Sequence, residues 1–242
     1  MKNASLLHLL SAFLFVAVLS SCQNAETAAD TAAATADAAT ETIAVAAKTA
    51  DPTASTEYQQ GVQVGDKAPT FKLKNIDDKL YSFENIKDAN GKAPKGFIVT
   101  FTCNTCPYAV GYEDRLIALH QKMSVLGYPV VAIQPNDPEV KDGDSFAQMK
   151  VRAQEKGFPF VYLLDAGQQI YPQYGASRTP EVYLVDSDLM VRYHGAIDDN
   201  AQDAEAVTVN YVEKAVTALQ NGLNPDPADV KAIGCTIKTK KT

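Results

Sequence analysis

The sequence predicts an α/β domain in which a central mixed β-sheet is flanked by helices. Strand and helix signals alternate in the order β-α-β-α-β from residue 96 to residue 164, after a hairpin signal and before a further strand pair and a closing helix. The chain has 242 residues, of which 46% are hydrophobic. This is enough for one sizeable core, so we expect one folded domain.

The first strands are predicted by alternation of apolar and polar residues. The segments TFKLKN and KLYSFE each alternate with period 2 and are separated by IDD, which is typical of an N-terminal β-hairpin. GFIVTF at 96–101 is a short apolar run and predicts a buried strand.

Helix signals follow at the expected spacing. After residue 106, apolar residues recur with helical period up to Leu126, and Gly127 is a suitable stop. YPVVAIQ then predicts a strand. Asp144 or Ser145 is a suitable N-cap for a second helix, which is expected to end at Gly157. FPFVYLL at 158–164 predicts another strand.

The last predicted elements are a strand pair and a helix. EVYLVDSDLMVRYHG at 181–195 reads as two strands joined by a tight turn. AEAVTVNYVEKAVTALQNG predicts a closing helix with Gly222 as its C-terminal cap.

The N-terminus has the features of an export signal. One basic residue, Lys2, precedes the apolar run LLHLLSAFLFVAVLS, which ends in small residues, so residues 1–21 are predicted to be a signal peptide. An uncleaved membrane anchor is the alternative, but the run is short for a full span and is interrupted by Ser11. LSSC at 19–22 resembles the lipobox of bacterial lipoproteins, and this resemblance implies that Cys22 becomes the acylated mature N-terminus.

Residues 22–56 are expected to form a flexible tether. They are rich in Ala and Thr and lack aromatic residues, so they cannot bury enough surface to offset the entropy of ordering. Of the net charge of −7, the signal carries +1 and the tether −4, which leaves −4 for the domain at 57–242. This mild acidity argues against a nucleic-acid partner.

The stretch FTCNTCPYAVGYEDR places two cysteines, Cys103 and Cys106, three positions apart and directly before a predicted helix. About 75 residues later, Arg178-Thr179-Pro180 precedes the strand pair. The combination resembles the thioredoxin fold, and more narrowly the extracytoplasmic thiol-disulfide proteins and peroxiredoxin-like redoxins. Those relatives carry an inserted helix and strand, which residues 137–164 match here.

A cysteine at a helix start is activated by unpaired N–H groups and the helix dipole, so Cys103 is the expected attacking thiol. Cys106, one turn on, is the expected resolving thiol of the redox-active disulfide. The resemblance further implies a cis Pro180, a Thr179 that faces the sulfurs, and a substrate-binding loop at 179–180.

The sequence departs from thioredoxin at two positions near the cysteines. Phe97 stands where thioredoxin has its buried aspartate, and Thr102 replaces a tryptophan. Proton transfer therefore needs water or another group, for which Glu113 is a weak accessory candidate beside the alternative of an ion-paired, solvated helix face.

The predicted activity is thiol-disulfide exchange in the bacterial envelope, on a lipid-anchored domain that faces the periplasm or the outside. The expected partners are protein thiols or disulfides and a membrane redox partner, with no cofactor and no metal. Reduction, oxidation and isomerisation all fit the motif.

Two other readings of the cysteine pair stay open. A zinc or Sco-like copper site would need further ligands from Cys235, His120 or His194, which lack ligand spacing. A peroxiredoxin-like thiol peroxidase would need Pro-x-x-x-Thr-x-x-Cys, of which Gly96 and Thr100 give only half. Arg178 is a possible accessory group in this reading.

Cys235, in KAIGCTIKTK, is a possible accessory thiol. Alternation predicts a short strand with Ile233, Cys235 and Ile237 directed inward, which suits a buried hydrophobic thiol. The Gly-Cys-Thr-Ile-Lys tail also resembles that of the peroxiredoxin-like relatives. This resemblance implies a tail folded back beside the active site, where Cys235 exchanges with the Cys103–Cys106 disulfide.

Overall fold

The structure is a computed structural model that describes residues 61–240. The predicted signal peptide, the lipidation site Cys22 and the tether therefore lie outside the described residues. Among the described helices, none combines the length and the apolar character needed to span a bilayer.

A mixed sheet is the centre of the described domain, as predicted. Its strand order is β2-β1-β5-β4-β3-β7-β8-β9, with β3–β4, β4–β5 and β8–β9 parallel and the other pairs antiparallel. A separate pair joins β6 and β10. The strands are β1 (Leu73–Asn75), β2 (Leu80–Tyr81), β3 (Gly96–Phe101), β4 (Val130–Gln134), β5 (Val161–Leu164), β6 (Arg178–Thr179), β7 (Glu181–Asp186), β8 (Val191–Gly195), β9 (Asp229–Val230) and β10 (Cys235–Thr236).

The three longer helices appear in the predicted order, but α4 begins at Tyr211, later than predicted, and the short α3 was not predicted. They are α1 (Pro107–Val125), α2 (Phe146–Lys156), the single turn α3 (Tyr171–Tyr174) and α4 (Tyr211–Gln220), with a 3₁₀ turn η1 at Asp142–Asp144. Of the two predicted caps of α2, Ser145 is the N-cap, and Gly157 ends the helix with a positive φ of 66°.

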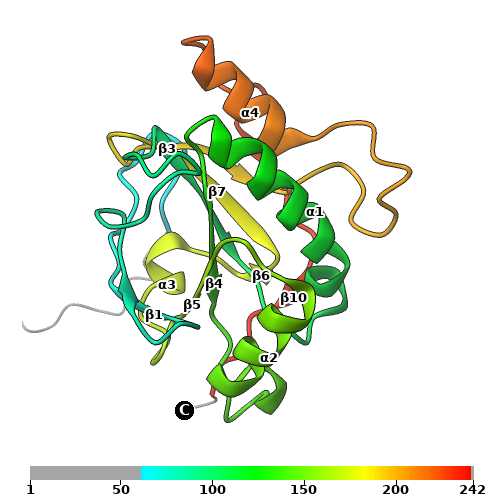
Figure 1. The fold of residues 1–242 in the computed structure, drawn as a ribbon. Coiled ribbons are helices and arrows are strands. Elements are labelled where there is room, and N and C mark those ends of the chain that lie inside the picture. Colours follow the sequence, from blue (N-terminus) through cyan, green and yellow to red (C-terminus); the bar gives the residue numbers. More distant parts are fainter. Residues whose placement is uncertain (1–60, 241–242) are drawn as a thin grey trace, which may run out of the picture. The chain divides into compact units, whose positions relative to one another are not determined.

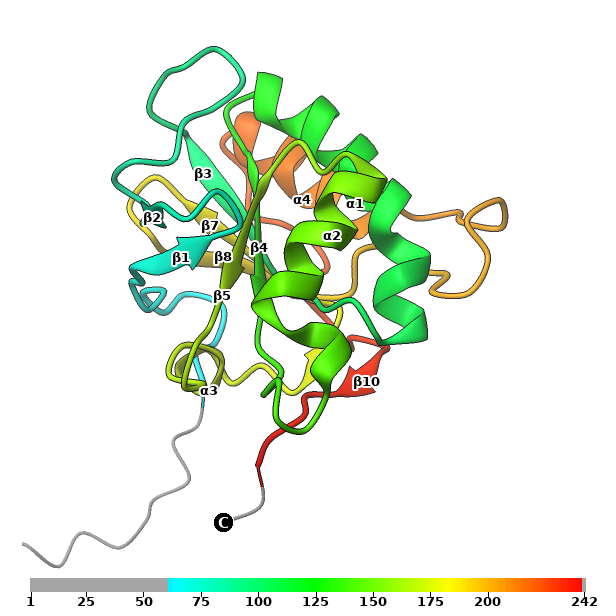
Figure 2. The same cartoon turned by 60° about the horizontal axis from the view of Figure 1, so that its bottom comes forward.

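Helices α1, α2 and α4 lie on one face of the sheet, and the β1–β2 region and α3 cover the other (Figures 1 and 2). All six residues of β3 are buried, so its side chains alternate between two apolar clusters. Ile98 packs with the helices, whereas Phe97 and Val99 pack with Phe71 and Phe83. This two-sided burial fixes β3 as the rigid centre of the domain.

Register brings two distant segments together at one end of the sheet. Strands β3 and β7 are antiparallel, with Phe101 opposite Glu181. The chain that leaves β3 therefore lies beside the chain that enters β7. These two segments are the cysteine motif at 103–106 and the Thr179-Pro180 loop.

Candidate functional site

Thr179 contacts both sulfurs of the cysteine motif. Its side-chain Oγ1 lies 3.3 Å from Cys103 Sγ, and its carbonyl oxygen lies 3.1 Å from Cys106 Sγ. The Thr179-Pro180 peptide bond is cis. Both motif cysteines are reduced in this structure and are only 3% exposed. The structure thus brings together the four residues that the sequence placed at the centre of the site.

The helix begins directly after the two cysteines, as predicted, and Cys106 is nearer to its N-terminus than Cys103. Pro107 is the first residue of α1 and Cys106 is its N-cap, so the positive end of the helix lies beside Cys106. The Ala109 N–H is directed at Cys106 and the Cys106 N–H at Cys103, so N–H groups at the helix start favour a thiolate at both sulfurs.

The contacts of the two thiols favour a protonated Cys103, which donates a hydrogen bond to Cys106, and an acidic Cys106. The hydrogen bond from Cys103 is the largest influence on Cys106; with contacts from Cys235 and the Ala109 N–H it outweighs burial and lowers the pKa of Cys106 to about 4. The same hydrogen bond, burial and the charge of Asp144 raise the pKa of Cys103, and the Thr179 hydroxyl and the Cys106 backbone N–H offset only a part.

One contact opposes this placement of the proton. The Thr179 carbonyl oxygen can only accept a hydrogen bond, so its 3.1 Å contact with Cys106 Sγ suits a protonated Cys106. The contacts from Cys103, Cys235 and the Ala109 N–H nevertheless lower the pKa of Cys106, so Cys106 is the more acidic thiol of the pair.

A buried carboxylate holds the motif turn, which we define as residues 103–106. Asp144 Oδ1 accepts the backbone N–H groups of Asn104 and Thr105 at 2.8 and 3.1 Å. Its Oδ2 accepts the Thr105 hydroxyl at 2.8 Å and the Asn136 side-chain amide at 2.7 Å. Asp144 has no exposed surface. The sequence pattern around Asp144 predicts only a helix cap and does not reveal this role.

The C-terminal tail also lies at the site. Strand β10 pairs antiparallel with β6 so that Cys235 is opposite Thr179, and Cys235 packs against Cys103, Cys106 and Ala109. Figure 2 shows β10 in red beside the end of α1 where the motif lies.

The alternation predicted for the tail holds only in part. Ile237 is 6% exposed and lies inside, as expected. The predicted inward position of Ile233 is wrong, because 52% of its surface is exposed. Residue 233 precedes the short strand, so the period-2 pattern does not extend to it.

The two charged accessory candidates contact other groups. The Arg178 guanidinium donates to the Gly234 carbonyl at 3.0 Å and so binds the tail. Glu113 is 4% exposed and accepts two hydrogen bonds from Arg152, at 2.7 and 2.6 Å. The predicted ion pair of Glu113 is therefore present, but the group is buried and not solvated.

Both histidines outside the N-terminal region have structural partners. His120 Nδ1 accepts the backbone N–H of Val130 at 3.2 Å. His194 lies between Glu181 Oε1 and Asp229 Oδ2, each 2.8 Å from one ring nitrogen. Within residues 61–240, no group of three or more His, Cys, Asp or Glu side chains is arranged to hold a metal ion.

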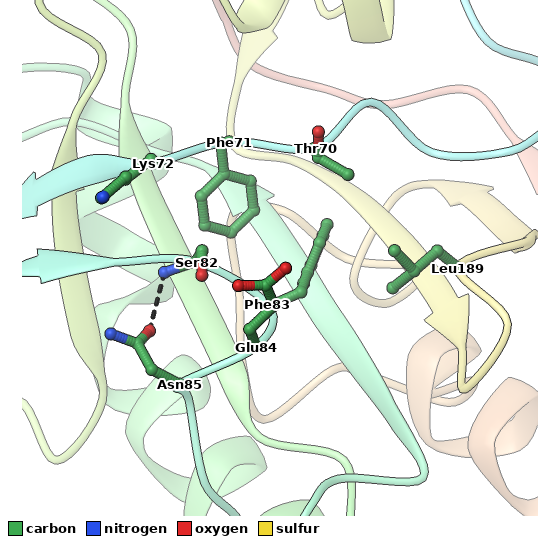
Figure 3. Close-up of a pocket in the computed structure, with 8 residues that line it drawn as sticks. All are labelled: Thr70, Phe71, Lys72, Ser82, Phe83, Glu84, Asn85 and Leu189. Carbon is green, nitrogen blue, oxygen red and sulfur yellow. Dashed lines mark hydrogen bonds between the residues drawn. The ribbon is translucent and has the colours of Figure 1, made fainter.

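A surface hollow of about 410 Å³ lies elsewhere in the domain (Figure 3). Phe71 and Phe83 form its apolar part, and Ser82 N donates to Asn85 Oδ1 at its rim. None of its lining residues contacts the sulfurs in the described hydrogen bonds or packing clusters.

Comparisons with known proteins agree with the fold. Residues 64–194 match the AhpC/TSA family. An uncharacterised conserved protein from Geobacillus kaustophilus has a similar structure, with 33% identity, a TM-score of 0.68 and coverage of 74% of this chain and 94% of its own. A hypothetical protein from Sinorhizobium meliloti 1021 has 28% identity, a TM-score of 0.68 and coverage of 76% and 98%.

A peroxidoxin from Mycobacterium tuberculosis is more distant, with 15% identity, a TM-score of 0.48 and coverage of 66% of this chain and 97% of its own. No curated protein sequence matches the chain. The domain is thioredoxin-like, and the family and the fold together support a redox function.

Proposed function

The protein belongs to the AhpC/TSA family, and on that premise we propose that it is a thiol-disulfide oxidoreductase whose Cys103–Cys106 pair cycles between dithiol and disulfide. The observation that carries this proposal is the position of Thr179, which contacts both sulfurs from a cis-proline loop. In this arrangement two thiols share one proton at the start of a helix. Such a pair exchanges disulfides through a mixed-disulfide intermediate.

The first test measures activity on a protein disulfide. Purified domain should reduce or oxidise a model substrate in a glutathione buffer, and the Cys103→Ser, Cys106→Ser double variant should lose the activity. Asp142→Ala, an exposed change near the site, is the matched control. Equal activity of the double variant and the unchanged protein would refute the proposal.

The direction of exchange follows from the reduction potential of the pair. A potential near about −270 mV indicates a reductant, and one near about −120 mV indicates an oxidant. The measurement is equilibration with glutathione, followed by quantification of the Cys103–Cys106 disulfide by mass spectrometry.

Trapping decides which thiol attacks. If Cys106 attacks, as its contacts favour, Cys103→Ala leaves substrate bound to Cys106 as a stable mixed disulfide. If Cys103 attacks, as the sequence analysis expected, Cys106→Ala accumulates substrate on Cys103. The mass of the trapped cysteine peptide distinguishes these outcomes.

We propose further that the domain acts at the bacterial envelope on a lipid anchor at Cys22, with protein thiols and a membrane redox partner as its reactants. The support is the lipobox-like LSSC sequence and the Ala/Thr-rich segment behind it. Cys22→Ala should accumulate as unprocessed precursor. Normal processing with normal membrane fractionation of this variant would contradict the anchor.

Thiol peroxidase activity is a second candidate, favoured by the AhpC/TSA match. Against it, Gly96 occupies the proline position of the motif and Arg178 donates to Gly234. Hydrogen peroxide consumption by the reduced protein, measured with and without Cys103→Ser, tests this candidate, because Cys103 occupies the cysteine position of the motif. Fast consumption that depends on Cys103 would favour a peroxidase.

A further inference from the structure

The two motif sulfurs are covered, whereas the third thiol of the domain is not. Cys103 and Cys106 are each 3% exposed, and Cys235 is half-buried. A substrate that approaches the site with the tail in place therefore reaches Cys235 before it reaches the motif.

The tail is anchored at several points, so its position is well defined. Ile237 N donates to the Ser177 carbonyl at 3.0 Å, and Lys238 N donates to Asn136 Oδ1 at 2.8 Å. The Arg178 guanidinium holds the Gly234 carbonyl. Displacement of the tail from the site would break these hydrogen bonds.

Gly234 lets the tail approach β6 closely. A Cβ atom at this position would lie 2.2 Å from the Thr179 carbonyl oxygen and 2.7 Å from the Thr179 carbonyl carbon. These atoms are backbone, so only glycine fits here. The close approach places the next residue, Cys235, opposite Thr179 and beside Cys106.

Cys235 contacts Cys106 in two ways. It packs against the cluster that contains Cys106, and its side chain and backbone N–H lower the pKa of the Cys106 thiol, which in turn raises the pKa of Cys235. The Tyr108 N–H, in the first turn of α1, points at the Cys235 sulfur. Cys106 and Cys235 therefore lie together at the start of α1.

We propose that Cys235 is a third redox-active thiol, which takes the disulfide over from the buried Cys103–Cys106 pair and exchanges it with substrate thiols at the surface. This proposal rests on the function proposed above and specifies the route by which the substrate reaches that site.

The steps balance without an additional reagent. The Cys235 thiolate attacks Cys106 Sγ, the Cys106–Cys235 bond forms, the Cys103–Cys106 bond breaks, and Cys103 leaves and takes up the proton that Cys235 has released to solvent. A substrate thiolate then attacks Cys235 Sγ and Cys106 leaves as a thiolate. A second substrate thiol displaces Cys235, so the substrate dithiol is oxidised and the Cys103–Cys106 pair is reduced. The reverse sequence reduces a substrate disulfide.

The charges at the site suit this order of steps. In the reduced protein, burial and the neighbouring Cys106 raise the pKa of Cys235 to about 11, which keeps it protonated. Formation of the Cys103–Cys106 disulfide removes the negative charge and the thiol hydrogen bond of Cys106. The Tyr108 N–H remains, so oxidation of the pair activates Cys235. In the second step, Cys106 is a good leaving group because helix-terminal N–H groups stabilise its thiolate.

A matched pair of variants tests the contact directly. After treatment of the full chain with diamide and an acid quench, Cys103→Ser should contain a Cys106–Cys235 disulfide in most molecules. Cys106→Ser should form an intramolecular disulfide at least tenfold more slowly. Two free thiols in oxidised Cys103→Ser would overturn the proposal. Equally fast formation of a Cys103–Cys235 disulfide in Cys106→Ser would also overturn it.

Turnover separates this proposal from the function on which it rests. Cys235→Ser should still form the Cys103–Cys106 disulfide but should exchange with a dithiol peptide at least tenfold more slowly than the unchanged protein. Thr236→Ala, an exposed side chain on the same strand, is the control and should exchange normally. Full activity of Cys235→Ser would overturn the relay alone. Failure of the unchanged protein to form a Cys103–Cys106 disulfide would overturn the proposed function.

Discussion

The motif turn and the Thr179-Pro180 loop face each other across the sulfurs but are held by different kinds of contact. Asp144 holds the motif turn, and its partners are backbone and side-chain groups that carry no charge. Glu181 holds the loop by accepting the N–H groups of Ser177 and Arg178 at 2.8 and 2.9 Å. Its other oxygen contacts His194.

The two sets of contacts differ in whether they include a group that changes charge near neutral pH. The described side-chain partners of Asp144 are hydroxyl and amide groups, which do not titrate near neutral pH. Glu181 shares a histidine with Asp229, and histidine is the side chain whose charge changes in this range. The contacts that hold the loop therefore include a histidine, whereas those that hold the motif turn do not.

Removing the carboxylate of the motif turn should have the largest effect. Asp144→Ala leaves two backbone N–H groups, the Thr105 hydroxyl and the Asn136 amide without their acceptor in a buried site. We expect a loss of about 3 kcal/mol or more in the free energy of unfolding. Urea denaturation gives the value, and exposed Asp142→Ala should stay within about 0.5 kcal/mol of the unchanged protein. A similarly small loss for Asp144→Ala would show that other contacts hold the turn.

The loop side is tested by Gly234→Ala. The new methyl group collides with the Thr179 backbone, so the tail must move away from β6 at a cost of about 1–3 kcal/mol. Iodoacetamide should then modify Cys103 and Cys106 in the native protein, as peptide mass spectrometry would show.

Gly111→Ala is the control for this change. Gly111 lies in α1, and a methyl group there would have no atom within 4 Å beyond its chain neighbours and the backbone of its own helix. Alanine should therefore stabilise the helix by about 0.5–1 kcal/mol without exposing either thiol. Unchanged protection of the thiols in Gly234→Ala would mean that the tail does not cover them.

The third prediction concerns pH. Burial alone would lower the pKa of His194, but its hydrogen bonds with Glu181 and Asp229 outweigh burial and raise it. Its contribution to stability should therefore be complete below the unfolded pKa of about 6.5 and be lost as pH rises through the raised folded value. Unfolding free energies measured from pH 5 to 9 should show this loss in the unchanged protein but not in His194→Asn.

His120 provides the opposite case in the same experiment. Burial lowers its pKa, so its contribution should be lost as pH falls below about 6.5. A high-pH loss of stability that persists in His194→Asn would assign the pH response to another group.

Tyr162→Phe should have the smallest effect. The Tyr162 hydroxyl donates to Asn104 Oδ1 at 2.9 Å and so adds one neutral hydrogen bond to the motif turn. Its loss should cost about 0.5–1.5 kcal/mol. Thermal unfolding checks this value, and a cost as large as that of Asp144→Ala would contradict the central role of the carboxylate.

Local signals were sufficient for most of the fold. The hairpin, the buried strand 96–101 and the helix after the cysteines each follow from periodicity and a glycine stop, because they depend on neighbouring residues. The proximity of Cys103 and Thr179 came from the family resemblance, and the register of β3 with β7 gives its physical basis.

The contacts that the sequence did not predict join residues far apart in the chain. Asp144 lies some forty positions after the motif turn, and its pattern there is that of a helix cap. Nothing local marks it as the acceptor for Asn104 and Thr105. The helix after the cysteines follows from periodicity, but the identity of the cysteine at its N-terminus does not, and only the backbone shows that Cys106 is the N-cap of α1.

The pairing of β10 with β6 has a further consequence for competition between strands. Because β10 belongs to the same chain, its effective concentration at the edge of β6 is on the order of millimolar, and any external strand that binds there must displace it. Dilute peptides in free solution will lose that competition. A protein confined beside the domain, such as one held on the same surface, would reach the required local concentration, so confinement could decide which proteins bind at β6.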